Sequence, residues 1–386
     1  MRQATTVAVE PTCVDAEHGP VNAAILATTL QAFPQQPLIM AGAGAHLTAV
    51  REILGPAGAG VEWREMDLPP RHMPPSRERR KLEARLWQGV FSNIVNGDTR
   101  RFLSLSSSES NLLPMKFRLW TRPSIAAVSV LHSVVGNLMA SRQRKLEWWA
   151  IPPPHLRWVV LSRHIQQRVA ALFPAIASRL CVLPHPLLPQ AQPDPESAPV
   201  DTERVVFTFP GVATPEKGFA DFCRLAESAA GIRSAKFVLA GRLSEAVPDN
   251  LLRFVEMPHS PKERMDRPSY QAALQRATYL VCPFRRDAYE FTASGSILDA
   301  LIHQKPLIGY DSTACVDNLF RELGDVGYRC RNWEEMCATV TGLASRRGPD
   351  RYAEQVRNMA EGRLRYSPPM LKDRLRSMFA ARSCAP

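Results

Sequence analysis

Short runs of apolar residues alternate with amphipathic stretches along the first 188 residues of the chain. Runs such as Val7-Ala8-Val9 and Val128-Ser129-Val130 are rich in β-branched residues and are too short for helices, which favours buried strands. The stretches between these runs carry apolar residues at helical spacing. We therefore predict strands at residues 6–9, 37–40, 102–105, 126–131 and 158–161, and helices at residues 21–33, at 47–54 and from the last strand to residue 173.

The second half of the chain repeats this alternation. Phe219, Phe222 and Leu225, for example, fall on one face of a predicted helix. The pattern predicts strands at residues 205–209, 236–240, 279–281 and 306–308, and helices at 219–229, 270–276, 296–303 and 333–343.

Buried strands that alternate with helices indicate an α/β protein with parallel sheets covered on both faces. A proline-rich stretch, residues 189–203, has neither helical nor strand period and predicts a linker. We expect two doubly wound, Rossmann-like domains at residues 1–188 and 204–350, facing across a cleft because ligands bind at the carboxyl ends of such sheets. Residues 351–386 are expected to be helical and to pack back on the first domain.

The charge of the chain indicates an anionic partner. Lys and Arg number 48 against 37 Asp and Glu, so the net charge is +11. Before Pro195 there are 21 basic and 13 acidic residues, against 27 and 24 after it. A basic first half suits a phosphorylated ligand or an anionic membrane surface. The alternative is that the excess of arginine reflects only the general composition of the chain and serves no binding function.

Other features of the composition favour a cytoplasmic protein. Eight cysteines are scattered without metal-ligand spacing, which is typical of reduced thiols. The beginning of the chain lacks a secretory signal. The longest apolar stretch, residues 125–140, is too short and too polar to span a bilayer.

Two loops in the second half combine glycine with a basic residue. Gly211 follows a predicted strand and permits close backbone approach, and Lys217-Gly218 opens a helix, which sets a charge beside a positive helix end. Arg242 follows the next strand and suits bidentate phosphate contact. Each feature is also found in ordinary β-α turns and solvated surfaces.

A third loop leads into the helix that begins near residue 295. Ser294 is a suitable N-cap, and Gly295 and Ser296 would expose N–H groups at the helix start. Capping alone explains these residues equally well.

In their order along the chain, these loops resemble the C-terminal, donor-binding domain of GT-B glycosyltransferases. The resemblance covers residues 205–331, and the first half matches only in layout. It rests on Gly211 with Lys217-Gly218, Phe237-Val238-Leu239-Ala240-Gly241, Tyr279-Leu280-Val281-Cys282-Pro283, Ser294-Gly295 with Asp299-Ala300-Leu301, and Lys305-Pro306-Leu307-Ile308; Leu183-Pro184-His185-Pro186-Leu187 looks like the family's segment before the linker.

The resemblance implies a role for each loop. Lys217 would contact the donor diphosphate, Gly211 would let it approach the backbone, and the helix start at residues 294–296 would cap it. Asp299 occupies the place of a glutamate that often binds the nucleotide ribose. Glu290 lies close to the glutamate that contacts the donor sugar in retaining members.

Two departures from the family pattern leave the stereochemistry open. Glu290 and Asp299 are nine residues apart, whereas the glutamates of retaining members are eight apart. In the family, an arginine often follows the loop glycine, and Val212 stands at that position here. Arg242, Arg285 or Arg286, which also lie in the second half of the chain, could supply the missing charge.

An inverting transferase needs a base to deprotonate the acceptor hydroxyl. His18 follows the first strand, with Asp15 and Glu17 near enough in sequence to orient it. His132, at the end of another strand, is a second candidate, either for donor binding or as a buried structural residue.

Three segments rich in cations, the second and third of which also carry aromatic residues, suit a membrane interface: residues 77–81, 116–120 and 142–149. Solvated helix faces with tryptophan in the core are the alternative. No nucleic-acid recognition module is present.

Together these features predict a hexosyltransferase that moves a sugar from a nucleoside diphosphate sugar to a glycolipid or polysaccharide hydroxyl, peripherally at the cytoplasmic membrane face. We expect no metal, because no Asp-x-Asp motif is present, and no cofactor other than the donor itself. The alternatives are a sugar-nucleotide epimerase or hydrolase of the same fold, and a non-catalytic scaffold that docks on membranes.

Overall fold

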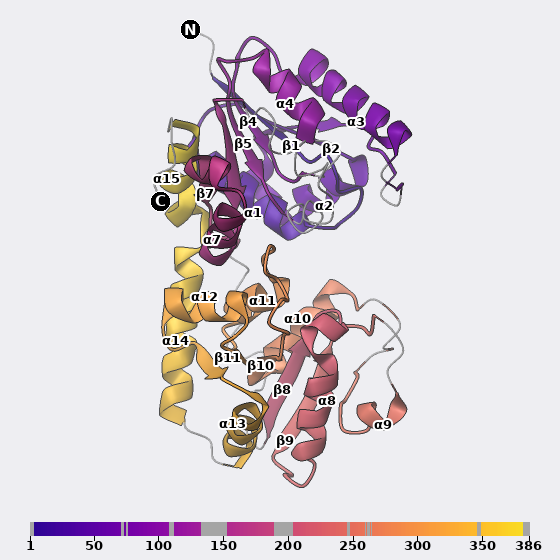
Figure 1. The fold of residues 1–386 in the computed structure, drawn as a ribbon, viewed down its shortest axis with the longest axis vertical. Helices are drawn as coiled ribbons and strands as arrows, with labels where there is room; N and C mark the ends of the chain where they lie inside the picture. Colours follow the sequence, from indigo (N-terminus) through magenta and orange to yellow (C-terminus); the bar gives the residue numbers. More distant parts are fainter. Residues whose placement is uncertain are drawn as a thin grey trace. The chain divides into compact units, whose positions relative to one another are not determined.

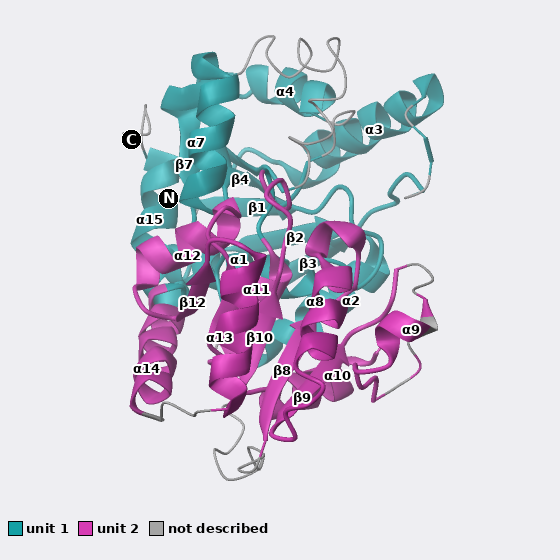
Figure 2. Cartoon of the chain, turned by 60° about the horizontal axis from the view of Figure 1, so that its bottom comes forward, with its two compact units in different colours: residues 1–188, 291–293, 366–386 teal, residues 189–290, 294–365 magenta. Residues whose placement is uncertain are grey.

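The computed structural model describes residues 4–70, 73–74, 76–107, 112–132, 153–188, 204–244, 248–258, 260, 263, 265–345 and 349–380. The chain forms two compact units (Figure 2): unit 1 comprises residues 1–188, 291–293 and 366–386, and unit 2 comprises residues 189–290 and 294–365. The predicted linker, residues 189–203, lies outside the described residues.

Unit 1, which begins at the indigo end of the chain in Figure 1, is built on a parallel sheet. The sheet has seven strands in the order β3-β2-β1-β4-β5-β6-β7. Its strands are β1 (Thr5–Val9), β2 (Leu38–Gly42), β3 (Val61–Glu65), β4 (Thr99–Ser104), β5 (Ala126–Val130), β6 (Leu156–Val160) and β7 (Leu180–Val182). Both faces of the sheet are covered: Val7 and Val9 belong to one hydrophobic cluster, whereas Ala8 belongs to the other. This two-sided burial is why the strands read as continuous apolar runs.

Two groups of helices supply these clusters. Helices α3 (Arg77–Gly89), α4 (Leu112–Trp120) and α7 (Arg163–Leu172) contribute to the first cluster. Helices α1 (Gly19–Ala32), α2 (Gly44–Leu54) and α15 (Pro368–Ala380) contribute to the second.

Helix α15 packs against α1, although the two are more than 330 residues apart in sequence. Leu371, Leu375 and Met378 bury their side chains in the second cluster. The Arg376 guanidinium donates to the Ala32 carbonyl at distances of 3.0 and 2.8 Å, at the end of α1. The carbonyls that end a helix have no partner within it, so a cation there is favourable.

Unit 2 contains a five-stranded parallel sheet with the order β12-β11-β10-β8-β9. Its strands are β8 (Val205–Pro210), β9 (Ala235–Ala240), β10 (Tyr279–Cys282), β11 (Leu307–Tyr310) and β12 (Gly327–Cys330). Its helices are α8 (Phe219–Ser228), α9 (Asp249–Leu252), α10 (Arg267–Arg276), α11 (Gly295–His303), α12 (Ala314–Leu323), α13 (Trp333–Ser345) and α14 (Pro349–Arg365). Helix α14 belongs to unit 2, so the part of the C-terminal segment that packs on unit 1 begins at residue 366.

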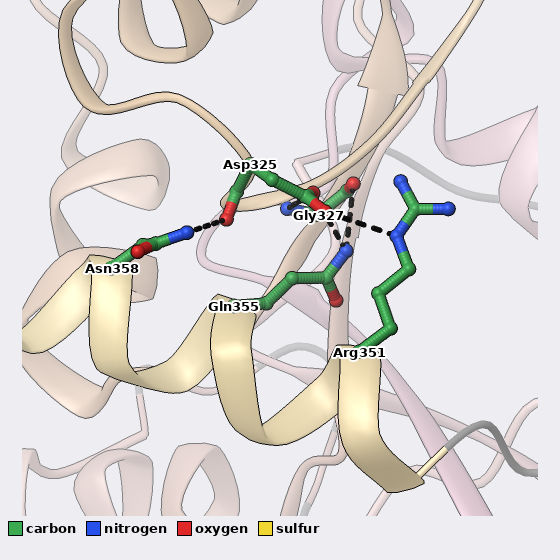
Figure 3. Close-up of polar contacts among 5 residues, drawn as sticks. All are labelled: Asp325, Gly327, Arg351, Gln355 and Asn358. Atoms are coloured by element: carbon green, nitrogen blue, oxygen red, sulfur yellow. Dashed lines mark hydrogen bonds and ion pairs between the residues drawn. The ribbon is translucent and has the colours of Figure 1, made fainter.

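Helix α14 is joined to the loop before β12 by a group of polar contacts (Figure 3). Gln355 Nε2 donates to Asp325 Oδ1 and to the Gly327 carbonyl, each at 2.9 Å, and Asn358 donates to the Asp325 carbonyl at 2.8 Å. Arg351 Nε lies 3.0 Å from Asp325 Oδ2. The Gln355 side chain is fully buried, so these bonds supply the partners that its Nε2 would otherwise have found in water, whereas its Oε1 has no hydrogen-bond partner among the described residues.

We expect Asp325→Ala to lower the free energy of unfolding by about 1–3 kcal/mol, because it removes a hydrogen-bond partner of buried Gln355. Arg351→Ala removes the exposed ion pair and the contact of the guanidinium with the Tyr328 ring, and should cost less, about 1 kcal/mol. Urea unfolding of both variants checks this. Equal losses of unfolding free energy in the two variants would show that these contacts between α14 and the loop before β12 depend on the ion pair instead.

In the part of the chain that the structure describes, no helix combines the length and the apolar character needed to cross a membrane. Among the described residues, the cysteines at positions 13, 223, 282, 315, 330 and 337 are free thiols.

Candidate functional site

The strand order of unit 2 reverses between β8 and β10, which lie side by side while their connections run in opposite directions. Ligands of open α/β sheets bind beyond the carboxyl ends of the strands at such a reversal. Strand β8 ends at Pro210 and β10 at Cys282. The loops that follow these two strands carry most of the predicted donor-site residues.

Glycine is required at the ends of β8 and β9. Gly211 has a φ of 82°, and its N–H donates to the Ala240 carbonyl at 2.6 Å. A Cβ on Gly241 would lie 1.8 Å from the Gly211 carbonyl oxygen. The two loops therefore meet backbone to backbone, which accounts for both glycines independently of any ligand.

Three polar atoms converge on the place that a side chain at position 211 would occupy. Lys217 Nζ lies 3.2 Å from that Cβ position, Ser296 Oγ 3.5 Å and the Tyr270 hydroxyl 3.9 Å. Lys217 Nζ donates to Ser296 Oγ at 3.2 Å, and Ser296 Oγ donates to the Pro210 carbonyl at 3.0 Å. We call Gly211, Lys217, Tyr270 and Ser296 the cradle.

The backbone before α8 holds Lys217 in this position. A 3-10 turn, Pro215–Lys217, leads into Gly218, which has a φ of 70° and begins α8. A Cβ on Gly218 would lie 1.9 Å from the Pro283 carbonyl oxygen, so only glycine fits there. Burial lowers the pKa of Lys217, partly offset by the charge of Asp299. A buried ammonium of this kind gains from an anion beside it.

Helix α11 supplies the second side of the cradle. Ser294 is its N-cap and accepts from the Ile297 N–H at 3.5 Å. The first turn of the helix contains no acidic residue. The first N–H groups of a helix have no partner within it, so this helix start suits a phosphate. Ser294 therefore caps the helix, and Ser296 contributes a side chain to the cradle.

Asp299 lies one turn further along α11 and is bonded to Tyr270. The Tyr270 hydroxyl donates to Asp299 Oδ2 at 2.6 Å. Burial raises the pKa of Asp299 to about 6, against the lowering effects of the Tyr270 hydrogen bond and the Lys217 charge. Burial, together with the Asp299 charge, raises the pKa of Tyr270 well above its usual range.

The structure places the other predicted donor residues outside the cradle contacts. Arg242 is exposed after β9, and its carbonyl accepts from the Ala213 N–H at 2.8 Å. Glu290 is half-buried in the loop between β10 and α11. Among the described contacts, none joins the Arg242 or Glu290 side chain to Lys217.

The strand order of unit 1 also reverses, between β1 and β4, and here the strand end carries a buried carboxylate. Glu10 Oε1 accepts from the Thr12 N–H at 2.9 Å and from the Cys13 N–H at 3.1 Å. The same oxygen accepts from Ser106 Oγ, which follows β4, and Oε2 accepts from Asn22 Nδ2 at 2.9 Å. Glu10 therefore holds the loop between β1 and α1 from within.

The outer part of this loop is held by His46. Its Nε2 lies 2.9 Å from Asn22 Nδ2, and its Nδ1 lies 2.6 Å from the Asp15 carbonyl oxygen. Asp15 is exposed, and its carboxylate accepts from the Glu17 N–H at 3.2 Å. The chain from Glu10 through Asn22 and His46 thus fixes the backbone immediately before His18.

The structure brings together the two histidines that the sequence singled out. His18 is exposed, is the N-cap of α1 and has a φ of 54°. His18 Nδ1 is hydrogen-bonded to His132 Nε2, and the ring centroids are 4.0 Å apart at an interplanar angle of 81°. Asp15 and Glu17 lie near His18 because they belong to the same loop. The side chain that the structure places against the His18 ring is that of His132.

A third histidine lies in the electrostatic range of this pair. Burial lowers the pKa of His185 to about 4, with a smaller contribution from His18. Burial lowers the pKa of His132 well below its usual range, and the charges of His18 and His185 add to this. His185 is therefore a neutral imidazole at pH 7, and burial disfavours the protonated form of His132 as well.

The basic and aromatic segments differ from each other in burial. Lys116 is buried, with its ammonium 5.5 Å from the Trp158 ring centre, and burial lowers its pKa to about 8. Phe117 and Trp120 of the same helix are 61% and 46% exposed. Arg77 is exposed in the first turn of α3. The third segment, residues 142–149, lies outside the described residues.

Three contributors were not identified from the sequence as site residues: Tyr270, His46 and Glu10's partner Asn22. Tyr270 falls inside a predicted helix, and nothing in its spacing from Asp299 distinguishes it from a core aromatic residue. Asn22 is a polar residue in an otherwise apolar helical stretch, a signal that could have pointed to a buried hydrogen bond.

No family model matches this sequence, and a search of curated proteins finds no significant match. Solved structures do match. A glycosyltransferase from Rickettsia africae superposes with a TM-score of 0.70 at 11% identity, covering 98% of this chain and 98% of that chain. Anabaena HepE in complex with UDP and glucose gives a TM-score of 0.63 at 12% identity, covering 98% and 99%.

A third match is a trehalose-6-phosphate structure from E. coli bound with UDP-2-fluoro glucose, with a TM-score of 0.67 at 10% identity, covering 99% of this chain and 100% of that chain. All three similarities extend over both units, with their two parallel, doubly wound sheets. The predicted α/β class is confirmed, and the chain has the fold of the GT-B glycosyltransferases.

Proposed function

We propose that this protein transfers a sugar from a nucleoside diphosphate sugar to a hydroxyl group of a lipid-linked or polysaccharide acceptor. The observation that carries this proposal is the cradle at the switch point of unit 2, where an ammonium, two hydroxyls and a helix start converge beside Gly211. Such a set suits a diphosphate. UDP in the HepE structure and UDP-2-fluoro glucose in the E. coli structure support a nucleotide ligand for this fold.

In this reaction the bond between the anomeric carbon and the diphosphate oxygen breaks, and a bond to the acceptor oxygen forms. Negative charge develops on the departing nucleoside diphosphate. Lys217 and the start of α11 would stabilise that charge. The acceptor hydroxyl loses its proton, and His18 is our candidate for the base that takes it.

Incubation with UDP-glucose, and separately with other nucleoside diphosphate sugars, tests this proposal. Release of the nucleoside diphosphate together with a glycosylated product, identified by mass spectrometry, would support it. Release with only free sugar would indicate a hydrolase, and an epimerised sugar would indicate an epimerase. A protein that binds no nucleotide in calorimetry would favour the scaffold alternative.

We also propose that the protein binds the cytoplasmic face of a membrane and finds its acceptor there. Helix α4 exposes Phe117 and Trp120, and Arg118 and Arg122 are exposed beside them. Aromatic side chains flanked by arginine favour the interface of an anionic bilayer. Lys116 takes no part, because it is buried against Trp158.

We expect the double variant Phe117→Ser and Trp120→Ser to bind vesicles of phosphatidylglycerol several times more weakly than the wild type, because it removes apolar area from the interface. Co-sedimentation at low and high salt measures this, and wild-type binding should fall with salt because exposed charges are screened. Met370→Ser, which removes an apolar group 65% exposed on α15, is the matched control. Equal weakening by Met370→Ser, or no wild-type binding at low salt, would contradict the proposal.

A further inference from the structure

His18 and His132 meet at the edge of the unit 1 sheet where its strands end. His18 lies in the loop between β1 and α1, and His132 lies two residues beyond the end of β5. Strands β1 and β5 flank β4 in the parallel sheet, so their carboxyl ends lie at the same edge. The two rings are nearly perpendicular, and His18 Nδ1 is hydrogen-bonded to His132 Nε2. The sheet topology therefore brings two imidazoles that are 114 residues apart in sequence into direct contact.

The backbone of His18 is held in a conformation that few non-glycine residues adopt. Its φ of 54° is left-handed, and such residues gather at functional sites. The His18 carbonyl accepts from the Asn22 N–H at 2.9 Å, and the Asp15 carbonyl before it is held by His46 Nδ1 at 2.6 Å. Because the backbone is fixed on both sides, the orientation of the imidazole depends on its side-chain torsions, and the contact with His132 acts on these.

A hydrogen bond between two imidazoles joins one N–H to one lone pair, so either ring can be the donor. If His132 Nε2–H donates, His18 carries its own proton on Nε2 and offers no lone pair there. If His18 Nδ1–H donates, the lone pair of His18 lies on Nε2. Once His18 gains a proton, both of its nitrogens are donors, and only the arrangement with His132 as acceptor keeps the bond. This second arrangement is the one that serves a base.

His132 is suited to accept this bond because its own protonation is disfavoured. Burial lowers the pKa of His132 well below its usual range, and the charges of His18 and His185 add to this. His185 brings no positive charge of its own at pH 7. Its Nδ1 lies 3.1 Å from the Pro186 carbonyl oxygen and so carries the proton of the neutral ring, and burial lowers the pKa of His185 to about 4. A proton gained by His18 therefore stays on His18 and does not pass to His132.

We propose that His132 is a positioning residue that accepts a hydrogen bond from His18 Nδ1–H and thereby makes Nε2 the nitrogen of His18 that takes the acceptor proton. The proposal rests on the transfer reaction proposed above. In that reaction the acceptor O–H bond breaks as its oxygen bonds to the anomeric carbon, and the proton goes to His18 Nε2. The electron pair of the breaking sugar–phosphate bond leaves with the nucleoside diphosphate. The bond to His132 strengthens as His18 becomes cationic, because hydrogen bonds from charged donors are the stronger ones.

Nuclear magnetic resonance of protein labelled with nitrogen-15 in its histidine rings tests the tautomer without any ligand. Protonated and lone-pair ring nitrogens have separate chemical shifts, and the signals lost in His18→Asn identify His18. At about pH 8, where ordinary imidazoles are neutral, wild-type His18 should carry its proton on Nδ1. In His132→Leu, His18 should change to the Nε2–H form. His132→Gln, whose amide oxygen also accepts a hydrogen bond, should keep the Nδ1–H form.

Steady-state kinetics supply a second readout, with UDP-glucose and GDP-mannose as donors and release of UDP or GDP as the signal. His132→Leu should lower kcat at least about tenfold and leave the KM for the donor within about twofold, because the tautomer of the base matters only in the chemical step. His132→Gln should recover at least about half of the lost kcat, since it restores the acceptor. His164→Leu, the same change at the start of α7, is the matched control and should alter neither the His18 tautomer nor kcat.

The possible failures are distinct. If the wild type releases nucleoside diphosphate from neither donor, the transfer function itself is wrong. If it does so but wild-type His18 carries its proton on Nε2, or His132→Leu keeps the Nδ1–H form, the role of His132 is wrong while the transfer function stands. A rise in the KM for the donor at unchanged kcat in His132→Leu would also overturn that role, because His132 would then bind the donor. Should His132→Leu fail to fold, the wild-type tautomer and His132→Gln decide the question.

Discussion

Replacement of His18 is expected to reduce turnover by about 100- to 10,000-fold while nucleotide affinity changes little, because the loss of a general base affects only the chemical step. His18→Asn is the informative variant. The φ of 54° at this position strains most side chains, but asparagine tolerates it. His18→Asn therefore removes the base without straining the start of α1. Steady-state kinetics with the sugar donor and calorimetry with UDP measure the two effects.

The control for His18 is a histidine of the same unit outside the β1–α1 loop. His164→Asn, at the start of α7, should keep full turnover. Full activity in a folded His18→Asn variant would reject the assignment. A lower melting temperature with unchanged turnover would show that His18 serves only to hold His132.

Replacement of Lys217 is expected to weaken nucleoside diphosphate binding about tenfold to a hundredfold, because a hydrogen bond to a charged group contributes about 1.5–3 kcal/mol. Lys217→Ala should not unfold the protein. Its ammonium is buried and its pKa is lowered by that burial, so its removal relieves a desolvation cost in the unliganded state. Titration of UDP and GDP into wild type and variant measures the change.

Lys236→Ala is the control for Lys217. Lys236 lies in β9 of the same unit and pairs with Glu256 at 2.7 Å, so its removal takes away one lysine without touching the cradle. Nucleotide affinity should be unchanged in this variant. An affinity loss shared by both variants would mean that net charge, and not the cradle, attracts the nucleotide.

The sequence by itself determined the α/β class and the alternation of strands and helices. Strands such as β1 and β8 are buried on both faces, so their apolar runs could be recognised without knowledge of their neighbours. Strand β3 was not predicted, because its residues Val61–Glu65 are mostly polar and only Val61 is buried. It pairs with β2 through its backbone at the edge of the sheet, and that pairing depends little on side chains.

The local parts of the candidate site could also be anticipated. Gly211, Lys217, Gly218 and the start of α11 lie in single loops, where glycine conformation and helix capping depend on a few neighbouring residues. Their order along the chain is what resembled the GT-B donor domain.

Only the tertiary structure decided which distant residues meet. The Tyr270–Asp299 bond, the pairing of His18 with His132 and the packing of α15 on α1 join residues that are 29, 114 and more than 330 positions apart. Lys116 resembled an interfacial lysine in sequence, yet it is buried against Trp158. Such contacts depend on the order of strands in each sheet and on which helix covers which face, and hydrophobic periodicity carries no information on either, because it reports only which side of an element is buried.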